Sequence, residues 1–203
     1  MIAIIDYGVG NLFSLTCSFK SIGADICVTS DPEVISKAER IILPGVGAFE
    51  DAAKKLRESG LDKVIKEECA KGKPLLGICL GMQMLFECSY EYGEHEGLGL
   101  IKGSIRPISD VIPVGLKIPH IGWNALSFGT NKDELFKYIN EGDCVYFVHS
   151  YYGADCAESV IATAEYGAPL TAAVRRDNVC GVQFHPEKSE KVGLSILKAF
   201  CEI

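Results

Sequence analysis

The sequence predicts an α/β protein with an open, mainly parallel sheet, helices on both faces of that sheet, and additional antiparallel strands in the C-terminal half. Short apolar runs alternate with helical segments through the first half of the chain. These runs are apolar at nearly every position, which is typical of parallel strands buried on both faces. The second half instead contains short strand-like runs separated by turn residues. The length of 203 residues fits a single domain spanning residues 1–203.

The first half is expected to contain four strands and five helices. The strands are residues 2–5, 24–29, 40–43 and 75–78, and the helices are residues 11–22, a segment starting at 30–33, and residues 49–57, 61–70 and 81–87. Asn11 is a suitable N-terminal cap for the first helix, and Pro32 favours an early position in the second. Pro44 and Gly45 end the third strand.

The second half is expected to add strands at residues 97–106, 116–119, 145–148, 159–164, 171–175 and 179–184. Arg176, Asp177 and Asn178 separate the last two runs and have the composition of a turn, so they predict a β-hairpin. The last segment, residues 189–201, has helical periodicity.

Composition and charge disfavour several classes of protein. The net charge of -7 disfavours a surface that binds nucleic acid or anionic membranes in general. The N-terminus lacks the basic start of a secretory signal, and the apolar runs are too short to span a bilayer, so we expect a cytoplasmic protein. The nine cysteines include no Cys-x-x-Cys pair and are irregularly spaced, so we expect neither a disulfide framework nor a metal site.

Cys79 is the strongest candidate for a catalytic nucleophile. It lies in the segment Gly77-Ile78-Cys79-Leu80-Gly81, after a predicted strand and before a predicted helix. This is the context of a nucleophile elbow, a sharp turn that lifts the nucleophile above the sheet. The glycines permit a tight turn, and the N-terminus of the following helix favours the thiolate. The alternative is a buried structural cysteine on a glycine-bracketed turn.

His185 and Glu187 are candidates for the base and the group that orients it. They lie in Gln183-Phe184-His185-Pro186-Glu187, at the end of the last predicted strand. A thiol nucleophile needs a base, and the base needs an orienting partner. Because Pro186 favours an extended conformation at His185, the two side chains can face the same way.

A glycine-rich loop at residues 43–49 follows the third strand. Ligands bind beyond the carboxyl ends of parallel strands, so this loop should lie near Cys79. Such a loop can point backbone N–H groups at a developing oxyanion, with the amide of Leu80 as a second donor. The alternatives are a turn that needs glycine only for packing and a phosphate-binding loop, which the lack of a following Walker lysine disfavours.

The three motifs together resemble those of the class I, or triad, glutamine amidotransferases. In that family a Gly-x-Cys-x-Gly cysteine, the histidine of a C-terminal Phe-His-Pro-Glu run and its glutamate form the triad, which places the roles on Cys79, His185 and Glu187. The resemblance covers nearly the whole chain and implies a flavodoxin-like fold. Residues 4–12, 44–49, 119–124 and 147–151 further resemble the glutaminase subunits of imidazole glycerol phosphate synthases.

The resemblance also implies roles for residues around the triad. Those that would hold glutamine are Gly47, Gln83, Ser150 and Tyr151. Those that would form the oxyanion hole are Gly45, Val46, Gly47 and Leu80. Those expected at a subunit interface are Trp123, Asn124 and Lys188. His120 and His149 lie in the same motifs, where we expect them to support packing or the interface.

The activity implied by the resemblance is hydrolysis of L-glutamine to glutamate and ammonia through a cysteinyl thioester. Ammonia would pass to a (βα)₈-barrel cyclase subunit in a heterodimer, and the cyclase would make imidazole glycerol phosphate and an aminoimidazole carboxamide ribonucleotide in histidine biosynthesis. No cofactor, metal, nucleic acid or membrane is expected to take part. The alternatives are a glutaminase subunit of a different synthase, a free-standing cysteine hydrolase of the same fold, and a non-enzymatic regulatory relative.

Overall fold

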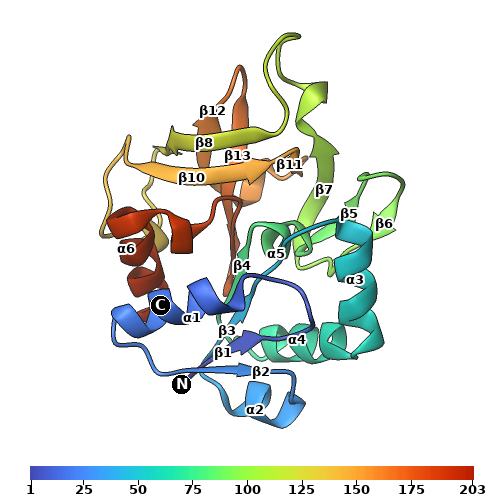
Figure 1. Ribbon diagram of the computed structural model, residues 1–203, viewed down its shortest axis with the longest axis vertical. Coiled ribbons are helices and arrows are strands. Elements are labelled where there is room, and N and C mark those ends of the chain that lie inside the picture. Colours follow the sequence, from blue (N-terminus) through green and yellow to red (C-terminus); the bar gives the residue numbers. More distant parts are fainter.

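The computed structural model describes residues 1–203, and its central element is an eight-stranded mixed sheet (Figure 1). Five parallel strands form one part of it, in the spatial order β2 (Ile26–Thr29), β1 (Ile2–Ile5), β3 (Arg40–Leu43), β4 (Leu75–Ile78) and β14 (Val179–Val182). Three antiparallel strands continue the sheet beyond β14, namely β13 (Pro169–Arg176), β12 (Val160–Glu165) and β9 (Ser127–Phe128). The predicted fold class is therefore confirmed.

The alternation of side chains along β1 shows why helices cover both faces of the parallel strands. Ile2 and Ile4 belong to the core that packs under the helices α1 (Leu12–Ser21) and α6 (Glu190–Cys201). Ala3 and Ile5 belong to the opposite core, under the helices α2 (Pro32–Lys37), α3 (Phe49–Glu58) and α4 (Leu61–Ala70). Figure 1 shows α6 on one side of the strands and α3 and α4 on the other. Each buried isoleucine contributes about 1.5–3 kcal/mol.

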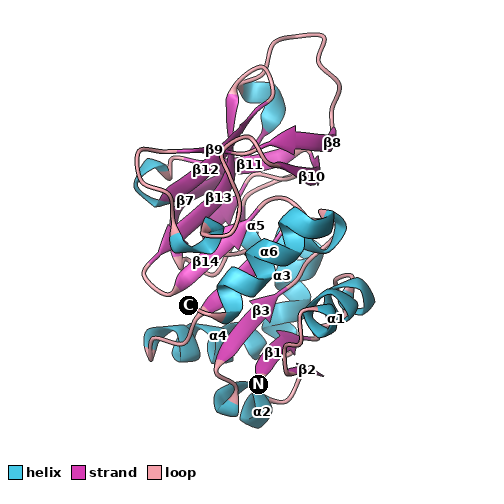
Figure 2. Ribbon diagram, turned by 90° about the vertical axis from the view of Figure 1, so that its left-hand side faces the viewer, coloured by secondary structure: helices cyan, strands magenta, loops and turns pink.

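Two smaller sheets complete the C-terminal half. One contains β11 (Tyr151–Ala154), β7 (Ile101–Pro107), β5 (Phe86–Ser89) and β6 (His95–Glu96), and the other contains β10 (Cys144–His149) and β8 (His120–Ala125). Short 3₁₀ turns occupy Ile108–Asp110, Glu134–Phe136, Ala157–Ser159 and Pro186–Lys188. Figure 2 shows β8, β10 and β11 gathered at the end of the molecule opposite α2. None of the helices has the length and apolar character needed to cross a bilayer.

The predicted helix starts and hairpin turn are confirmed. The Asn11 side chain accepts a hydrogen bond from Ser14 N (3.3 Å) and caps α1. Asp31 caps α2 in the same way, and Pro32 takes the first helical position. At the hairpin between β13 and β14, Arg176 pairs with Val179, and Asp177 adopts a left-handed conformation.

The predicted helix over residues 81–87 is wrong. The helix α5 (Leu80–Gln83) is only four residues long, and the chain then forms the strand β5. The carbonyl groups of Met84 and Leu85, which would continue the helix, accept hydrogen bonds from the amides of residues 98, 100 and 101. Apolar periodicity does not distinguish these alternatives because Phe86 is fully buried in either.

The predicted strand over residues 116–119 is also wrong. The strand in this region is β8, which starts one residue later and pairs with β10 from His120 opposite His149. Leu116 and Ile118 are exposed and have no strand partner. An apolar run was therefore mistaken for a strand because its partner strand lies elsewhere.

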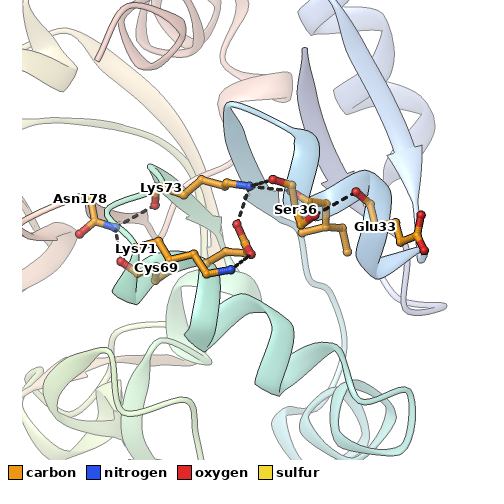
Figure 3. A network of polar contacts seen from close by, with 8 residues as sticks. Glu33, Ser36, Cys69, Lys71, Lys73 and Asn178 are labelled. Carbon is orange, nitrogen blue, oxygen red and sulfur yellow. Dashed lines mark hydrogen bonds and ion pairs between the residues drawn. The ribbon is translucent and has the colours of Figure 1, made fainter.

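A buried ion-pair network ties the parts together at the amino end of the parallel strands (Figure 3). Lys73 Nζ donates to Glu68 Oε2 (2.6 Å) and to the carbonyls of Ile35 (2.8 Å) and Ser36 (2.7 Å). The carboxylate also accepts from Lys71 Nζ (2.6 Å). Asn178 Nδ2, in the hairpin turn, donates to the carbonyls of Cys69 (3.0 Å) and Lys73 (2.8 Å). The network thus joins α2, α4 and the turn before β14.

Replacing Lys73 with methionine is expected to lower the free energy of unfolding by about 3 kcal/mol, because a buried carboxylate and two carbonyl groups lose their donor. The matched control is Lys71→Met, where the side chain is 65% exposed against 10% for Lys73. Its loss should stay under about 1 kcal/mol because exposed ion pairs contribute little. Urea denaturation at neutral pH measures both, and equal losses would contradict the assignment.

The same network predicts how the difference depends on pH. Hydrogen bonds from Lys71 and then Lys73 lower the pKa of Glu68 from its ordinary value of 4.5. A carboxylate with a lowered folded pKa stabilises the fold fully above its unfolded pKa, and the contribution is lost as the pH falls through the folded pKa. The gap between the wild type and Lys73→Met should therefore narrow below pH 4.5.

Candidate active site

The carboxyl ends of three neighbouring strands bring the sequence motifs together. Gly77 in β4 pairs with Leu43 in β3 on one side and with Gly181 in β14 on the other. Cys79 follows β4 directly, and its amide donates to Val182 O in β14 (2.8 Å). The glycine-rich loop after β3, the cysteine after β4 and the histidine after β14 consequently share one edge of the sheet.

Cys79 occupies a strained turn, as expected for a nucleophile elbow. Its backbone has φ 54° and ψ -112°, a conformation that residues with a side chain rarely adopt. The glycines make the turn possible because a Cβ atom on Gly81 would overlap Leu43 O, and one on Gly77 would lie 2.7 Å from Gly81 O. The thiol is 8% exposed, so it is accessible only through the adjoining cavity.

His185 and Glu187 form a buried hydrogen-bonded pair. His185 Nδ1 lies 2.8 Å from Glu187 Oε1, and the two side chains are 3% and 1% exposed. The backbone of His185 is extended and its amide donates to Tyr146 O (2.9 Å). Burial lowers the pKa of His185, but hydrogen bonds and charges from Cys79 and Glu187 outweigh it and raise the pKa to about 9. The imidazole is therefore cationic at neutral pH, next to the thiol.

The glycine-rich loop packs directly against the elbow. A Cβ atom on Gly45 would lie 2.7 Å from Gly81 N and 3.0 Å from the Tyr7 hydroxyl. Tyr7 Oη donates to Pro44 O (2.7 Å), and burial followed by the nearby Cys79 raises the pKa of Tyr7. No backbone carbonyl accepts a hydrogen bond from the amides of Val46 or Leu80. Both amides lie at the cavity and can bind an oxyanion there.

A cavity of about 530 Å³ opens in front of the thiol. Residues expected from the sequence line it, namely Val46, Gly47, Cys79, Leu80, Gln83, Ser150, Tyr151 and His185. Residues that were not expected also line it, among them Glu91, Tyr92, Pro107, Ser109, Pro119 and His149. No three His, Cys, Asp or Glu side chains cluster as metal ligands would.

Glu91 is the most informative residue that the sequence did not reveal. It lies in a polar loop between β5 and β6, where nothing distinguishes it from neighbouring carboxylates. Its Oε2 atom accepts from Phe49 N (2.6 Å) at the first residue of α3. The carboxylate thereby links the loop over the cavity to the end of the glycine-rich loop, and it supplies the cavity with negative charge.

Two glutamine side chains connect the cavity wall to the thiol. Gln83 Nε2 donates to Gln183 Oε1 (3.0 Å) and lies 3.4 Å from Tyr151 O. Gln183 Nε2 in turn lies 3.8 Å from Cys79 Sγ and can donate to it. Gln83 is still in α5 despite the shortness of that helix, so its predicted reach toward the cavity holds.

The three residues expected at an interface lie outside the cavity. Lys188 Nζ stands 5.8 Å from the centroid of the Tyr146 ring, and the Trp123 ring packs edge-on against the same tyrosine at 6.1 Å. Trp123 and Lys188 are exposed on one face. Asn124 differs, because its side chain turns inward and donates to Glu165 O (2.8 Å).

Comparison with known proteins gives consistent results for the sequence and the fold. The family model "Glutamine amidotransferase class-I" matches residues 3–202. The "Imidazole glycerol phosphate synthase subunit HisH" of Aquifex aeolicus is 49% identical over 97% of this chain and 94% of its own length. The protein of the same name from Wolinella succinogenes is 47% identical over 100% of both chains.

Solved structures show the same fold at low sequence identity. A glutamine amidotransferase crystal structure superposes with a TM-score of 0.76 at 19% identity, covering 99% of this chain and 100% of the other. The structure of PurLQS from Thermotoga maritima gives a TM-score of 0.72 at 21% identity, covering 99% of this chain and 97% of the other. These similarities concern the fold alone.

Proposed function

The chain belongs to the class I glutamine amidotransferases and, within them, to the imidazole glycerol phosphate synthase subunit HisH proteins, and from this premise we propose how it works. It hydrolyses L-glutamine at Cys79 and delivers the ammonia to a (βα)₈-barrel cyclase subunit, with residues 1–203 acting as one glutaminase domain. The supporting observation is the buried arrangement of Cys79 and the His185–Glu187 pair at the floor of the cavity.

The first half of the reaction forms a thioester. The Cys79 thiolate attacks the carboxamide carbon of glutamine, and the carbonyl oxygen becomes an oxyanion stabilised by the amides of Val46 and Leu80. The cationic His185 then donates its proton to the leaving nitrogen, and the C–N bond breaks to release ammonia. Glu187 holds the imidazole through Nδ1 throughout, so that Nε2 faces the reacting atoms.

The second half of the reaction regenerates the thiolate. His185, now neutral, takes a proton from water, and the resulting hydroxide attacks the glutamyl thioester. The C–S bond breaks, glutamate leaves, and the thiolate reforms beside the protonated histidine. The balance is one glutamine and one water consumed for one glutamate and one ammonia, which requires no metal and no organic cofactor.

The cavity wall suits both ends of glutamine. Gln83, Ser150 and Tyr151 present amide, hydroxyl and backbone groups that can bind the amino-acid end of the substrate. Glu91 adds a carboxylate that can pair with the α-ammonium group, which favours free glutamine over an amide without that charge. The charge of the substrate therefore selects its orientation, with the carboxamide toward Cys79.

The exposed face containing Ile121, Trp123 and Lys188 is the proposed docking surface for the cyclase. Ile121 and Trp123 are 57% and 50% exposed, although both are large and apolar. Such residues are enriched at protein interfaces. They lie on β8, next to the cavity residues Ile118 and Pro119, so a docked partner would close the mouth of the cavity and receive ammonia there.

The decisive experiment mixes the purified chain with a (βα)₈ cyclase subunit from the same genome. Glutamate release is measured for the chain alone, with the cyclase, and with the cyclase and its nucleotide ligand, beside a Cys79→Ala control. We expect weak release alone and an increase of about 10²-fold or more with cyclase and ligand, the size of effect that one well-placed oxyanion donor produces.

Other outcomes would direct the assignment elsewhere. Vigorous Cys79-dependent release without any partner would indicate a free-standing amidohydrolase and overturn the subunit assignment. Release that increases only with a different synthase would retain the glutaminase chemistry and move the chain to that partner.

Tyr7→Phe is expected to reduce kcat by about tenfold and stability by about 1 kcal/mol, because the buried carbonyl of Pro44 loses its donor. The loop that supplies the oxyanion amide would then be held less firmly, whereas the glutamine-binding groups would be unchanged, so KM should stay constant. Tyr138→Phe removes a hydroxyl that donates to Glu202 on the surface (2.6 Å) and serves as the control. Steady-state kinetics and thermal unfolding of both variants test this, and a rise in KM with constant kcat would argue against it.

A further inference from the structure

A row of hydrogen-bonded side chains lies behind the cavity wall and plays no part in the chemistry described above. His120 on β8 and His149 on β10 face each other in register, with His120 Nδ1 3.0 Å from His149 Nε2. The other ring nitrogen of His149, Nδ1, lies 2.8 Å from Tyr151 O. The row continues outward from His120 Nε2, which is 3.3 Å from Asn124 Nδ2.

The two ends of this row determine the position of every proton in it. Tyr151 O can only accept, so His149 Nδ1 carries hydrogen. At the other end, Asn124 Oδ1 accepts from Ala125 N (2.8 Å) and Nδ2 donates to Glu165 O (2.8 Å), which fixes the orientation of the amide. Asn124 therefore donates to His120 Nε2, and His120 Nδ1 donates to His149 Nε2. With both rings neutral, each hydrogen bond has one donor and one acceptor.

The surroundings keep both rings neutral. His120 and His149 are 3% and 6% exposed, and the His120 ring is stacked between Phe147 (4.9 Å) and Tyr166 (4.2 Å). Burial lowers the pKa of His120, and burial together with the neighbouring His120 and His185 lowers the pKa of His149 to about 4. A second proton on either ring would place two N–H groups face to face, so the row exists only in the neutral form.

The inner end of the row reaches a group that also contacts the substrate wall. Tyr151 O lies 3.4 Å from Gln83 Nε2, and both residues line the cavity. The outer end belongs to β8, whose alternate residues Ile121 and Trp123 are exposed on the other face of the strand. One strand therefore carries both an exposed apolar surface and the first histidine of the row.

We propose that Asn124, His120 and His149 form a charge-neutral relay that fixes the Tyr151 carbonyl, so that the position of β8 sets the geometry of the glutamine-binding wall. His120 and His149 are positioning residues, since neither reaches the reacting atoms. The proposal deepens the proposed function and rests on it for the identity of the substrate. Its direct consequence is that breaking the relay weakens glutamine binding and leaves the chemistry at Cys79 intact.

The first test is independent of glutamine. Long-range ¹H–¹⁵N NMR spectra of the ¹⁵N-labelled wild-type chain report which ring nitrogens carry protons. We expect both histidines to be neutral at pH 7, with the proton on Nδ1 and a bare Nε2. A cationic ring, or a proton on Nε2 of either residue, would overturn the relay whether or not the protein proves to be a glutaminase.

The second test measures glutamine hydrolysis in the complex with the cyclase and its ligand. His149→Leu should raise KM for glutamine about tenfold and change kcat by less than about twofold, the effect of losing one or two positioning hydrogen bonds. His149→Asn places an amide N–H where Nδ1 was and should restore KM to within about threefold of the wild type. His120→Phe keeps the ring stacking but removes the donor, so its KM should rise as in His149→Leu.

Controls separate positioning from packing. Tyr166→Phe keeps the stacked ring beside His120 and removes only a hydroxyl that donates to Lys117 O, so its KM should not change. The rate at which iodoacetamide alkylates Cys79, followed by peptide mass spectrometry, should be the same in all variants because it requires no glutamine. A loss of kcat at constant KM, or equal defects in His149→Leu and His149→Asn, would overturn the proposal. An inactive wild type would instead refute the proposed function and leave the NMR result to stand or fall alone.

Discussion

Replacing Cys79 with alanine is expected to lower glutamate release by about 10⁴-fold or more, because the thiolate is the group that forms the covalent intermediate and no other group can substitute for it. The amides and the cavity would remain, so the variant should still bind glutamine. Cys144→Ala removes an exposed thiol away from the cavity and should retain full activity.

Trapping the intermediate gives a second readout for the same residue. Rapid acid quenching of the wild type during turnover should show a glutamyl adduct on the peptide that contains Cys79, and the alanine variant should show none. Retention of more than about one part in 10² of the activity by Cys79→Ala would place the nucleophile elsewhere, since loss of a nucleophile costs far more than that.

Replacing Glu187 with alanine is expected to lower kcat by about 10³-fold, because the imidazole loses the partner that fixes its tautomer and its orientation. Glu187→Gln is the informative companion. Its side-chain oxygen can still accept from His185 Nδ1, so the expected loss is only about tenfold, the scale of a charge-assisted hydrogen bond weakened to a neutral one. Glu187 Oε2 has no hydrogen-bond partner in the wild type, so no second contact is lost when the amide replaces it.

The pH dependence of kcat/KM separates the charge of Glu187 from its geometry. Glu187 is one of the two groups that raise the pKa of His185 to about 9, and a raised pKa means that the protonated ring persists up to that pH. Removing the negative charge lowers this pKa, so the alkaline limb of the profile should move to lower pH in Glu187→Gln. An unmoved limb, or a glutamine variant as inactive as alanine, would show that Glu187 does not act through His185.

The sequence allowed the triad and the edge of the sheet where it lies to be predicted, because each motif directly follows an apolar strand. The carboxyl ends of adjacent parallel strands must meet, so Cys79, His185 and the loop at residues 43–49 could be placed together without coordinates. The pattern failed for residues 81–87 and 116–119, where apolar residues are buried or exposed for reasons set by distant strands.

Residues that act through long-range contacts could not be found in the same way. Tyr7 reaches Pro44 across 37 positions, Gln83 reaches Gln183 across 100, and Glu91 reaches Phe49 across 42. Each of these side chains belongs to a common type in an unremarkable local context. Only the fold shows that they meet at the cavity, and only register shows that His120 and His149 form a pair.

The Lys73 network of Figure 3 lies at the amino end of the same strands whose carboxyl ends hold Cys79 and His185. Stability and turnover are consequently set by separate groups of residues, divided by the length of β4. Protein engineering can exploit that separation, because substitutions that raise heat tolerance around Glu68 and Asn178 should combine freely with substitutions that alter substrate choice around Gln83.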